Sequence, residues 1–301
     1  MTEPAPEHPR ESPPLDSTAQ LLTRISRRLG TQLSLVSPNG SRSPMHRIRR
    51  SAPTLVAVAH GSRDPRALAT VLELLDRVRE LRPGLDVRLG HIELNEPLLA
   101  DTLDGLAQGD AVLVPLLLGR GHHVRHDLPR AAAAARHLRT RVAAPLGPHP
   151  LLVDALHARL VEAGWRDEDG TDGGAAVVLA AAGSRDPGSD ADARRTAALL
   201  SDRLGGIPVV PAYASAAAPT VPDALRALAA QGRHRVALAS YFTAPGRFAT
   251  LSAAAAPGVA AAPLGAHPAM ARLLLHRYDQ ALHTGGPAHA ALTHPPFPAT
   301  A

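Results

Sequence analysis

Residues Ala111–Pro129 read AVLVPLLLGRGHHVRHDLP, and this stretch decides how the rest of the chain is interpreted. Its first part, Ala111–Leu118, is an uninterrupted apolar run, which is typical of a strand buried on both faces. Two glycines then interrupt the run, and a cluster of histidines and arginines follows. Asp127 is the expected N-cap of an alanine-rich helix that comes next. The stretch predicts a strand–loop–helix unit with imidazoles at the carboxyl end of the strand, where open parallel sheets bind ligands.

Composition limits the classes of protein to which the chain can belong. Its 301 residues suffice for two domains, and the absence of cysteine excludes disulfides, thiolate metal sites and cysteine nucleophiles. Without an apolar run of membrane-spanning length or a signal-peptide core, we expect a cytoplasmic protein with no membrane contact. The net charge is +5 but aromatic residues make up only 2%. Nucleic-acid platforms interleave aromatic and basic residues, so this balance favours a small anionic ligand over nucleic acid.

Strand and helix patterns alternate from Thr54 onward. The predicted strands are Leu55–Ala59, Val87–Ile92, Ala111–Leu117 and Val142–Leu146. The predicted helices are Arg66–Leu81, Pro97–Ala107, Leu128–Leu138 and Pro150–Ala163. The first helix carries an apolar stripe of Ala67, Val71, Leu74, Leu75 and Val78. This alternation predicts an α/β fold with right-handed crossovers and a parallel sheet covered on both faces.

The same design occurs twice. Gly61–Pro65 (GSRDP) recurs at Gly183–Pro187, and Ala144–Pro150 (APLGPHP) recurs as APLGAHP at Ala262–Pro268. Pro97 matches Pro219 and Gly121 matches Gly246, so four matches follow in one order at offsets of 118 to 125 residues. We therefore predict a tandem duplication. The expected parts are a flexible tail (1–50), a first α/β domain (51–165), a degenerate second domain (175–283) and a flexible tail (284–301).

The two copies differ at the polar positions. His60 corresponds to Ala182, Glu93 to Ser215 and His123 to Phe248. The neighbouring pairs are His122 with Arg247, His126 with Leu251 and Asp127 with Ser252. Structural positions are kept while imidazoles and carboxylates disappear, which indicates that the first half carries the chemistry.

The strings VAVAHGSRDP, IELNEP and VPLLLGRGHHVRHDLP resemble the class II chelatases of the sirohydrochlorin type, the CbiX and SirB group. In that family one histidine ends the first strand and another lies in a G-x-H-V-x-x-D-[IL]-P segment, which places them at His60 and His123. A glutamate that often ends the second strand matches Glu93. The resemblance covers about residues 54–282; Gly119, Arg120 and the additional His122 and His126 depart from its pattern.

The resemblance implies two tandem Rossmann-like or flavodoxin-like domains whose parallel sheets face a central cleft. It also implies ATP-independent insertion of Fe²⁺ or Co²⁺ into sirohydrochlorin, towards siroheme or cobalamin. His60 and His123 would be catalytic and would hold the metal together with Glu93, since imidazole and carboxylate suit such cations. Arginines clamp carboxylates, so we expect these residues to bind substrate: Ser62, Arg63, Arg120, Arg125, Arg185 and Arg247. No cofactor beyond the substrate metal is expected, and the duplicated chain is expected to be a monomer with an internal pseudo-dimer.

Several residues also have structural interpretations. Glu93 could instead be a carboxylate at a helix N-terminus, and the two interpretations are balanced. His122 and His126 are interpreted as exposed neighbours of the site. Asp64-Pro65 and Asp186-Pro187 persist in both halves and are assigned to helix capping, and His149 and His267 also persist and are assigned structural roles.

Two other functions compete with metal insertion. A non-catalytic tetrapyrrole or metal carrier could use the same scaffold, but the joint presence of His60, Glu93 and His123 favours catalysis. A basic nucleic-acid-binding protein is disfavoured by the scarcity of aromatics and the lack of a binding motif.

Overall fold

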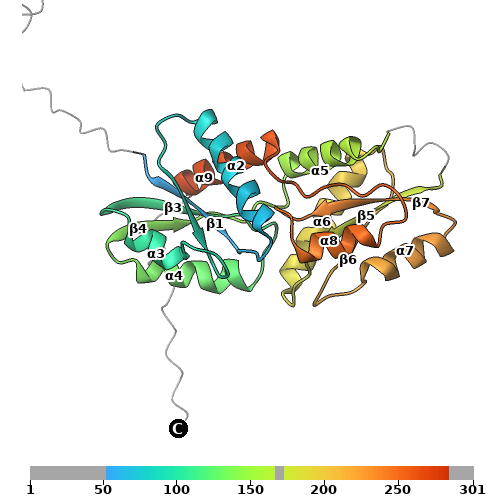
Figure 1. The fold of residues 1–301 in the computed structure, drawn as a ribbon, viewed down its shortest axis with the longest axis horizontal. Helices are drawn as coiled ribbons and strands as arrows, with labels where there is room; N and C mark the ends of the chain where they lie inside the picture. The colour runs from blue at the N-terminus through green and yellow to red at the C-terminus, as the bar shows by residue number, and fades with distance from the viewer. Residues whose placement is uncertain (1–51, 167–172, 285–301) are drawn as a thin grey trace, which may run out of the picture. The chain divides into compact units, whose positions relative to one another are not determined.

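The first half forms a four-stranded parallel sheet in the order β2-β1-β3-β4 (Figure 1). The computed structural model describes residues 52–166 and 173–284. The strands are β1 (Thr54–Ala59), β2 (Val87–His91), β3 (Gly109–Pro115) and β4 (Leu138–Val142). Because β1 lies between β2 and β3, the crossovers leave it in opposite directions, and this reversal opens a crevice at the carboxyl ends of the strands.

Helices cover both faces of this sheet, as the continuous apolar run of β1 requires. The helices of the first half are α2 (Pro65–Leu81), α3 (Leu99–Asp104), the π-helix η1 (His123–Asp127), α4 (Leu128–Ala134) and α5 (Pro150–Glu162), of which α5 lies over the second sheet. Leu55 and Ala57 of β1 belong to the core cluster that contains α2, whereas Val56 and Val58 pack with residues of α3 and α4. The predicted apolar stripe of α2 is the set of residues that it buries, so this prediction is confirmed.

The second half repeats the plan with a smaller sheet in the order β6-β5-β7. Its strands are β5 (Ala175–Ala181), β6 (Val209–Tyr213) and β7 (Arg235–Tyr241). Its helices are α6 (Pro187–Arg203), α7 (Val221–Ala230), α8 (Arg247–Ala254) and α9 (Pro268–Thr284). An isolated parallel bridge between Leu238 and Ala260 stands where the first half has β4.

The last helix of each half packs against the other half. In Figure 1, α9 lies beside α2 over the first sheet, and α5 lies over the second sheet, where it contacts α6 and β7. Tyr278 of α9 donates a hydrogen bond to the Pro53 carbonyl (2.6 Å), and Arg159 of α5 donates to the Leu264 carbonyl (3.0 Å). One apolar core consequently runs through both halves, with smaller clusters on the outer faces. The sequence-based boundaries of two separate domains remain a prediction, and this exchange was not foreseen.

Helix capping, which is the same in both halves, explains the repeated GSRDP and HP motifs of the chain. Asp64 and Asp186 accept hydrogen bonds at the starts of α2 and α6, each followed by proline as the first helical residue. His149 Nδ1 accepts from Leu151 N (3.1 Å), and His267 Nδ1 accepts from Ala269 N (3.2 Å). The structural assignments made for these positions are confirmed.

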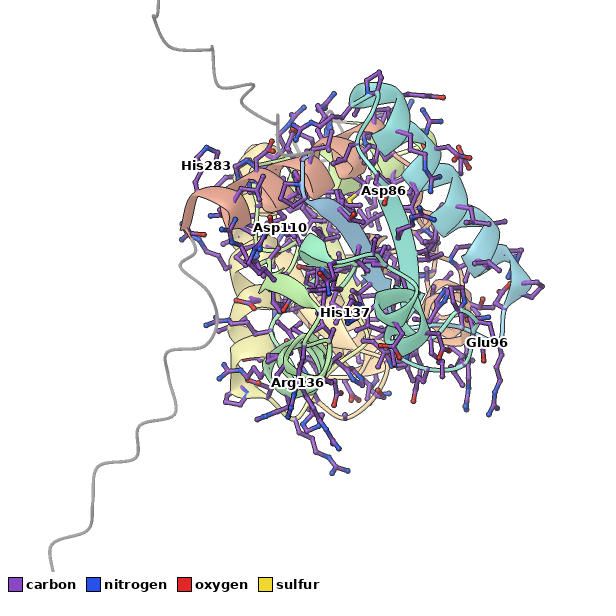
Figure 2. The ribbon with its side chains drawn as sticks, turned by 90° about the vertical axis from the view of Figure 1, so that its left-hand side faces the viewer. Asp86, Glu96, Asp110, Arg136, His137 and His283 are labelled. Atoms are coloured by element: carbon purple, nitrogen blue, oxygen red, sulfur yellow. The ribbon has the colours of Figure 1, made fainter. Side chains whose placement is uncertain are left out.

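Two local predictions are wrong. The fourth strand is Leu138–Val142, not Val142–Leu146. β4 is an edge strand, which faces solvent on one side and therefore contains arginines. Its Arg139 pairs with Asp110 of the adjacent β3, and Asp110 is labelled in Figure 2, which views the molecule from this side. Asp127 has helical backbone angles and makes no cap, because its carboxylate is bonded to His123 instead.

None of the helices in residues 52–166 and 173–284 is both long and apolar enough to cross a bilayer. The predicted tails at 1–50 and 284–301 lie almost entirely outside the described residues, as do positions 167–172 between the two predicted domains.

Candidate active site

Three neighbouring strands bring the predicted site residues to one edge of the first sheet. His60 directly follows β1, Glu93 follows β2, and His123 begins η1 in the loop after β3. Because β2 and β3 pair in parallel with β1 on either side, their carboxyl ends meet around His60. The ring centroids of His60 and His123 lie 4.9 Å apart in an edge-to-face arrangement, and His60 Nε2 lies 3.5 Å from Glu93 Oε1.

Both imidazoles use Nδ1 for a local hydrogen bond. His123 Nδ1 lies 2.7 Å from Asp127 Oδ2, and His60 Nδ1 lies 3.3 Å from the Gly61 carbonyl oxygen. In the tautomer that carries its proton on Nδ1, each ring donates to this oxygen and presents the lone pair of Nε2 to a metal; at His60 the Nε2 atom also faces Glu93. A carboxylate behind a histidine in this way orients the ring.

The site is partly open to solvent. The side chains of His60, Glu93 and His123 are 42%, 54% and 35% exposed. Within the described ranges no three histidine, aspartate or glutamate side chains are already gathered in a geometry that would hold a metal ion. The three predicted ligands are adjacent, but they do not form a complete coordination shell.

Gly61 determines how closely β1 and β2 can approach at the site. Its φ is +101°, and a Cβ atom there would lie 1.8 Å from the Glu93 carbonyl oxygen. The loop after it is held by Asn95, whose side-chain oxygen accepts from Ser62 N (2.6 Å). Only glycine allows this contact, which places the backbone of Glu93 against that of His60.

The second half has the same framework without the polar groups. Gly183 has φ +90°, and its Cβ would lie 1.8 Å from the Ser215 carbonyl oxygen, as at Gly61. Ala182 and Ser215 occupy the positions of His60 and Glu93, and Phe248, 38% exposed, occupies that of His123. None of these side chains can act as a base or hold a borderline metal.

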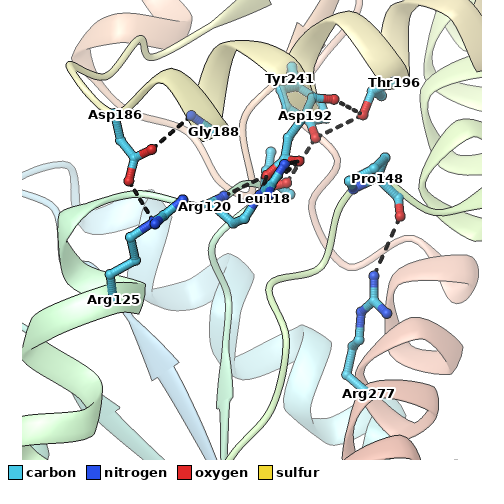
Figure 3. Close-up of polar contacts among 10 residues, drawn as sticks. All are labelled: Leu118, Arg120, Arg125, Pro148, Asp186, Gly188, Asp192, Thr196, Tyr241 and Arg277. Atoms are coloured by element: carbon cyan, nitrogen blue, oxygen red, sulfur yellow. Dashed lines mark hydrogen bonds and ion pairs between the residues drawn. The ribbon is translucent and has the colours of Figure 1, made fainter. Parts of the chain in front are cut away.

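Two of the predicted substrate-binding arginines pair with the second half (Figure 3). Arg120 forms a bidentate pair with Asp192, whose oxygen also accepts from Arg120 N (2.8 Å), and Asp192 is 4% exposed. This carboxylate raises the pKa of Arg120 through their hydrogen bonds. Arg125 Nε lies 2.8 Å from Asp186 Oδ2. The loop that leads to His123 is therefore anchored by α6 of the other half.

The remaining predicted substrate contacts differ from these two. Arg63 and Arg185 are exposed on loops, and Arg247 is exposed at the start of α8. The hydroxyl of Ser62 accepts a hydrogen bond from Asp64 N (3.1 Å). The substrate-binding role of these residues stays a prediction.

A cleft of about 630 Å³ lies where the two halves meet. Its lining comes from η1 and its N-cap on one side and from the second GSRDP loop on the other. The lining residues are His122, Arg125, His126, Ser184, Arg185, Asp186 and Pro187. Its size is within the range of small-molecule sites, and it opens beside His123.

Sequence reasoning missed three residues that organise the site. Asp127 was interpreted as a cap, although it stands four residues from His123 and is lost together with it in the second copy. Those two signals would have identified it. Asn95 and Asp192 act through contacts between segments 33 and 72 residues apart, for which a single sequence has no signal.

Comparisons with known proteins find related sequences. The sirohydrochlorin ferrochelatase of Bacillus subtilis (strain 168) is 27% identical over 176 residues, which cover 56% of this chain and 66% of that protein. The sirohydrochlorin cobaltochelatase of Priestia megaterium is 25% identical over 197 residues, 63% of each chain. The matches thus span slightly less than two thirds of these relatives.

Solved structures share the fold. SirB from Bacillus subtilis with Fe³⁺ has a TM-score of 0.62 at 24% identity, covering 76% of this chain and 95% of that one. A CbiX described as the terminal enzyme of siroheme biosynthesis in denitrifying bacteria has a TM-score of 0.55 at 24% identity, covering 74% and 98%. The sequence model of the CbiX family matches twice, over residues 54–163 and 176–281. Since these matches take in well over half of its length, the chain belongs to the CbiX family, with the family's unit present in both halves.

Proposed function

We propose that this protein inserts a divalent metal ion, Fe²⁺ or Co²⁺, into sirohydrochlorin without ATP, towards siroheme or cobalamin. The observation that carries the proposal is the convergence of His60, Glu93 and His123 at one sheet edge, in the only half that contains them. Both ferrochelatases and cobaltochelatases occur among the relatives, and imidazole and carboxylate bind both cations.

The reaction consumes M²⁺ and a tetrapyrrole with two pyrrole N–H groups, and it releases the metal complex and two protons. The Nε2 atoms of His60 and His123 can replace water on the metal, and once the metal moves to the macrocycle they can accept the pyrrole protons. Glu93 neutralises part of the cation's charge from the adjacent strand. An incomplete set of ligands suits this task, because a metal held in a closed shell would not be released.

The exposed arginines have a different proposed role, which is to bind the substrate. Arg63, Arg185 and Arg247 are exposed, Arg185 lines the cleft, and guanidinium groups pair with carboxylates in a bidentate manner. We propose that they bind the carboxylates of the substrate. Arg120 and Arg125 would join them only where the substrate competes with Asp192 and Asp186.

The test uses the purified full chain with sirohydrochlorin and Fe²⁺ or Co²⁺, followed by the absorbance of the macrocycle. We expect insertion by the wild type, and losses of about 100-fold or more for His60→Ala and His123→Ala. Glu93→Gln should retain the shape of the site and lose part of the activity. His276→Ala, which removes an exposed imidazole on α9, is the matched control and should remain active.

The alternatives give different results. Tight tetrapyrrole binding with no metal insertion by the wild type would identify a carrier instead of an enzyme. Unchanged rates in His123→Ala, with the circular dichroism spectrum of the wild type, would remove that residue from the mechanism.

We further propose that one chain forms one complete site, because both halves already line the cleft that a single unit would have to complete by dimerisation. A monomer in light scattering, with one tetrapyrrole bound per chain, is the expected result. Two tetrapyrroles per chain would contradict the assignment of the chemistry to the first half. A cytoplasmic location without a nucleic-acid partner or further cofactor stays a prediction.

A further inference from the structure

Two exposed histidines lie beside the proposed site and have no task in it. His122 directly precedes η1 and His126 lies within it, and their ring centroids are 4.7 Å apart with an interplanar angle of 39°. They are four residues apart, so they project from the same side of the helical turn. Both line the cleft between the halves.

Packing does not explain these two residues. The side chain of His122 is 73% exposed, and His126 is also exposed. The equivalent positions of the second half hold Arg247 and Leu251, so the fold of this unit does not require imidazoles there. Both histidines are found only in the half that contains His60 and His123.

We propose that His122 and His126 form an outer docking site for a divalent transition-metal ion such as Co²⁺ or Fe²⁺. Two imidazoles on adjacent turns bind such ions well, and water would complete the coordination shell. His122 Nε2 also lies 3.9 Å from Asp127 Oδ1, which adds a nearby negative charge. A site with two protein ligands exchanges its ion readily, which is required of a site that passes the ion on to the inner site.

The position of this pair suits transfer to the inner site. Successive ring centroids from His126 to His122, His123 and His60 are 4.7, 6.2 and 4.9 Å apart. Asp127 contacts the rings at the middle of this series, with Oδ2 on His123 and Oδ1 near His122. The docking itself is independent of chelatase activity, whereas a role in loading the metal rests on the proposed function.

The cations of the cleft do not prevent metal binding. Arg125 is paired with Asp186 at 2.8 Å, so its charge is compensated at the cleft wall. Arg185 is exposed on the opposite loop, so solvent and salt screen its repulsion of a metal ion at the histidine pair.

The chain also contains a pair that serves as a control. The rings of His149 and His276 are 4.7 Å apart as well, at 47°. Burial lowers the pKa of His149 to about 4, so its ring is neutral at pH 7. Because Nδ1 accepts the capping hydrogen bond from Leu151 N, the ring proton lies on Nε2, and neither nitrogen has a lone pair free for a metal. Ring proximity alone therefore does not make a metal site, and His276→Ala tests this point.

The experiment titrates the full chain with Co²⁺ alone, using calorimetry and the visible absorption of the bound ion. We expect two ions per chain for the wild type and for His276→Ala. The double variant His122→Ala/His126→Ala should lose the outer ion and keep the inner one, and His60→Ala/His123→Ala should do the reverse. A stoichiometry that stays at two in His122→Ala/His126→Ala, or is one in the wild type, would overturn the proposal.

A second measurement separates this inference from the proposed function. With sirohydrochlorin present, loss of the outer pair should raise the Co²⁺ concentration for half-maximal rate about tenfold. An unchanged concentration dependence would overturn the loading role. Two bound ions without any insertion by the wild type would refute the chelatase proposal and leave the outer docking site standing.

Discussion

Gly61→Ala tests whether backbone contact at the sheet edge builds the site. The change places a methyl group 1.8 Å from the Glu93 carbonyl oxygen, about half of a normal van der Waals separation. The positive φ alone costs about 1–2 kcal/mol for a residue other than glycine. Moving Glu93 away disrupts the hydrogen bonds Glu93 N to the His60 carbonyl and Asn95 N to the Glu93 carbonyl, at about 1 kcal/mol each. We expect a total loss of about 3–4 kcal/mol.

Two other glycines separate the cost of the positive φ from the cost of the clash with a carbonyl oxygen. Gly84 has φ +84° but an open environment, so Gly84→Ala should lose only the backbone cost of about 1–2 kcal/mol. Gly183 reproduces the clash of Gly61 in the second half, against the Ser215 carbonyl oxygen. Gly183→Ala should therefore match the stability loss of Gly61→Ala but retain much more of the activity.

Urea unfolding followed by circular dichroism measures the free energy of each variant, and the insertion assay measures its rate in the absence of urea. Displacement of His60 or Glu93 by about 1 Å should reduce the rate of Gly61→Ala about 100-fold. Equal destabilisation in Gly61→Ala and Gly84→Ala would refute the argument from the clash. Equal loss of activity in Gly61→Ala and Gly183→Ala would refute the location of the chemistry in the first half.

Three further changes test other parts of the structure. Asp127→Asn removes the charge behind His123 and should weaken the affinity of the inner site for Co²⁺ about 10- to 100-fold, with little change in the urea midpoint. An unchanged affinity in the Co²⁺ titration would show that Asp127 does not position His123. Burial, followed by the charges of nearby cations, lowers the pKa of His149 to about 4. In the unfolded chain the pKa of this histidine is near 6.5, so between about pH 6.5 and pH 4 the unfolded state binds a proton that the folded state does not. The free energy of unfolding is therefore at its full value above about pH 6.5 and falls by about 1–2 kcal/mol towards pH 4, a figure reduced because the side chain is partly exposed. His149→Asn keeps a capping acceptor and should flatten this pH dependence of the urea midpoint, and an equally steep profile would contradict it. Asp192→Asn should speed hydrogen exchange at the Arg120 amide, which donates to Asp192 at 2.8 Å, whereas unchanged exchange would show that the loop needs no anchor.

The second half has kept structural tasks although it lost the polar site residues. It supplies Asp192 and Asp186 to the loop before His123, and Tyr241 donates to the Leu118 carbonyl at the start of that loop (2.9 Å). Its last helix also covers the first sheet. The first half is therefore not expected to fold or to hold its loop correctly without the rest of the chain.

Local and periodic features were readable from the amino-acid sequence. The continuous apolar run at Ala111–Leu118 predicted a strand buried on both faces, because only such strands exclude polar residues from both sides, and Leu55–Ala59 was predicted as a strand as well. The duplication was visible as two copies of GSRDP, and comparison of the copies singled out His60, Glu93 and His123. Parallel pairing then sufficed to predict that these three side chains meet, since the carboxyl ends of adjacent strands share an edge.

Other features were decided only by tertiary contacts. The apolar residues at Val142–Leu146 suggested a strand, but Ala143 and Leu146 fill a buried loop while the true edge strand contains arginines. The short loop contact that holds Asn95 against Ser62 N also joins two segments that are separate in the sequence. The exchange of α5 and α9, and the ion pair between Arg120 and Asp192, join segments remote in sequence. A short-range pattern determines which face of an element is apolar, but which surface covers that face depends on the packing of the whole chain.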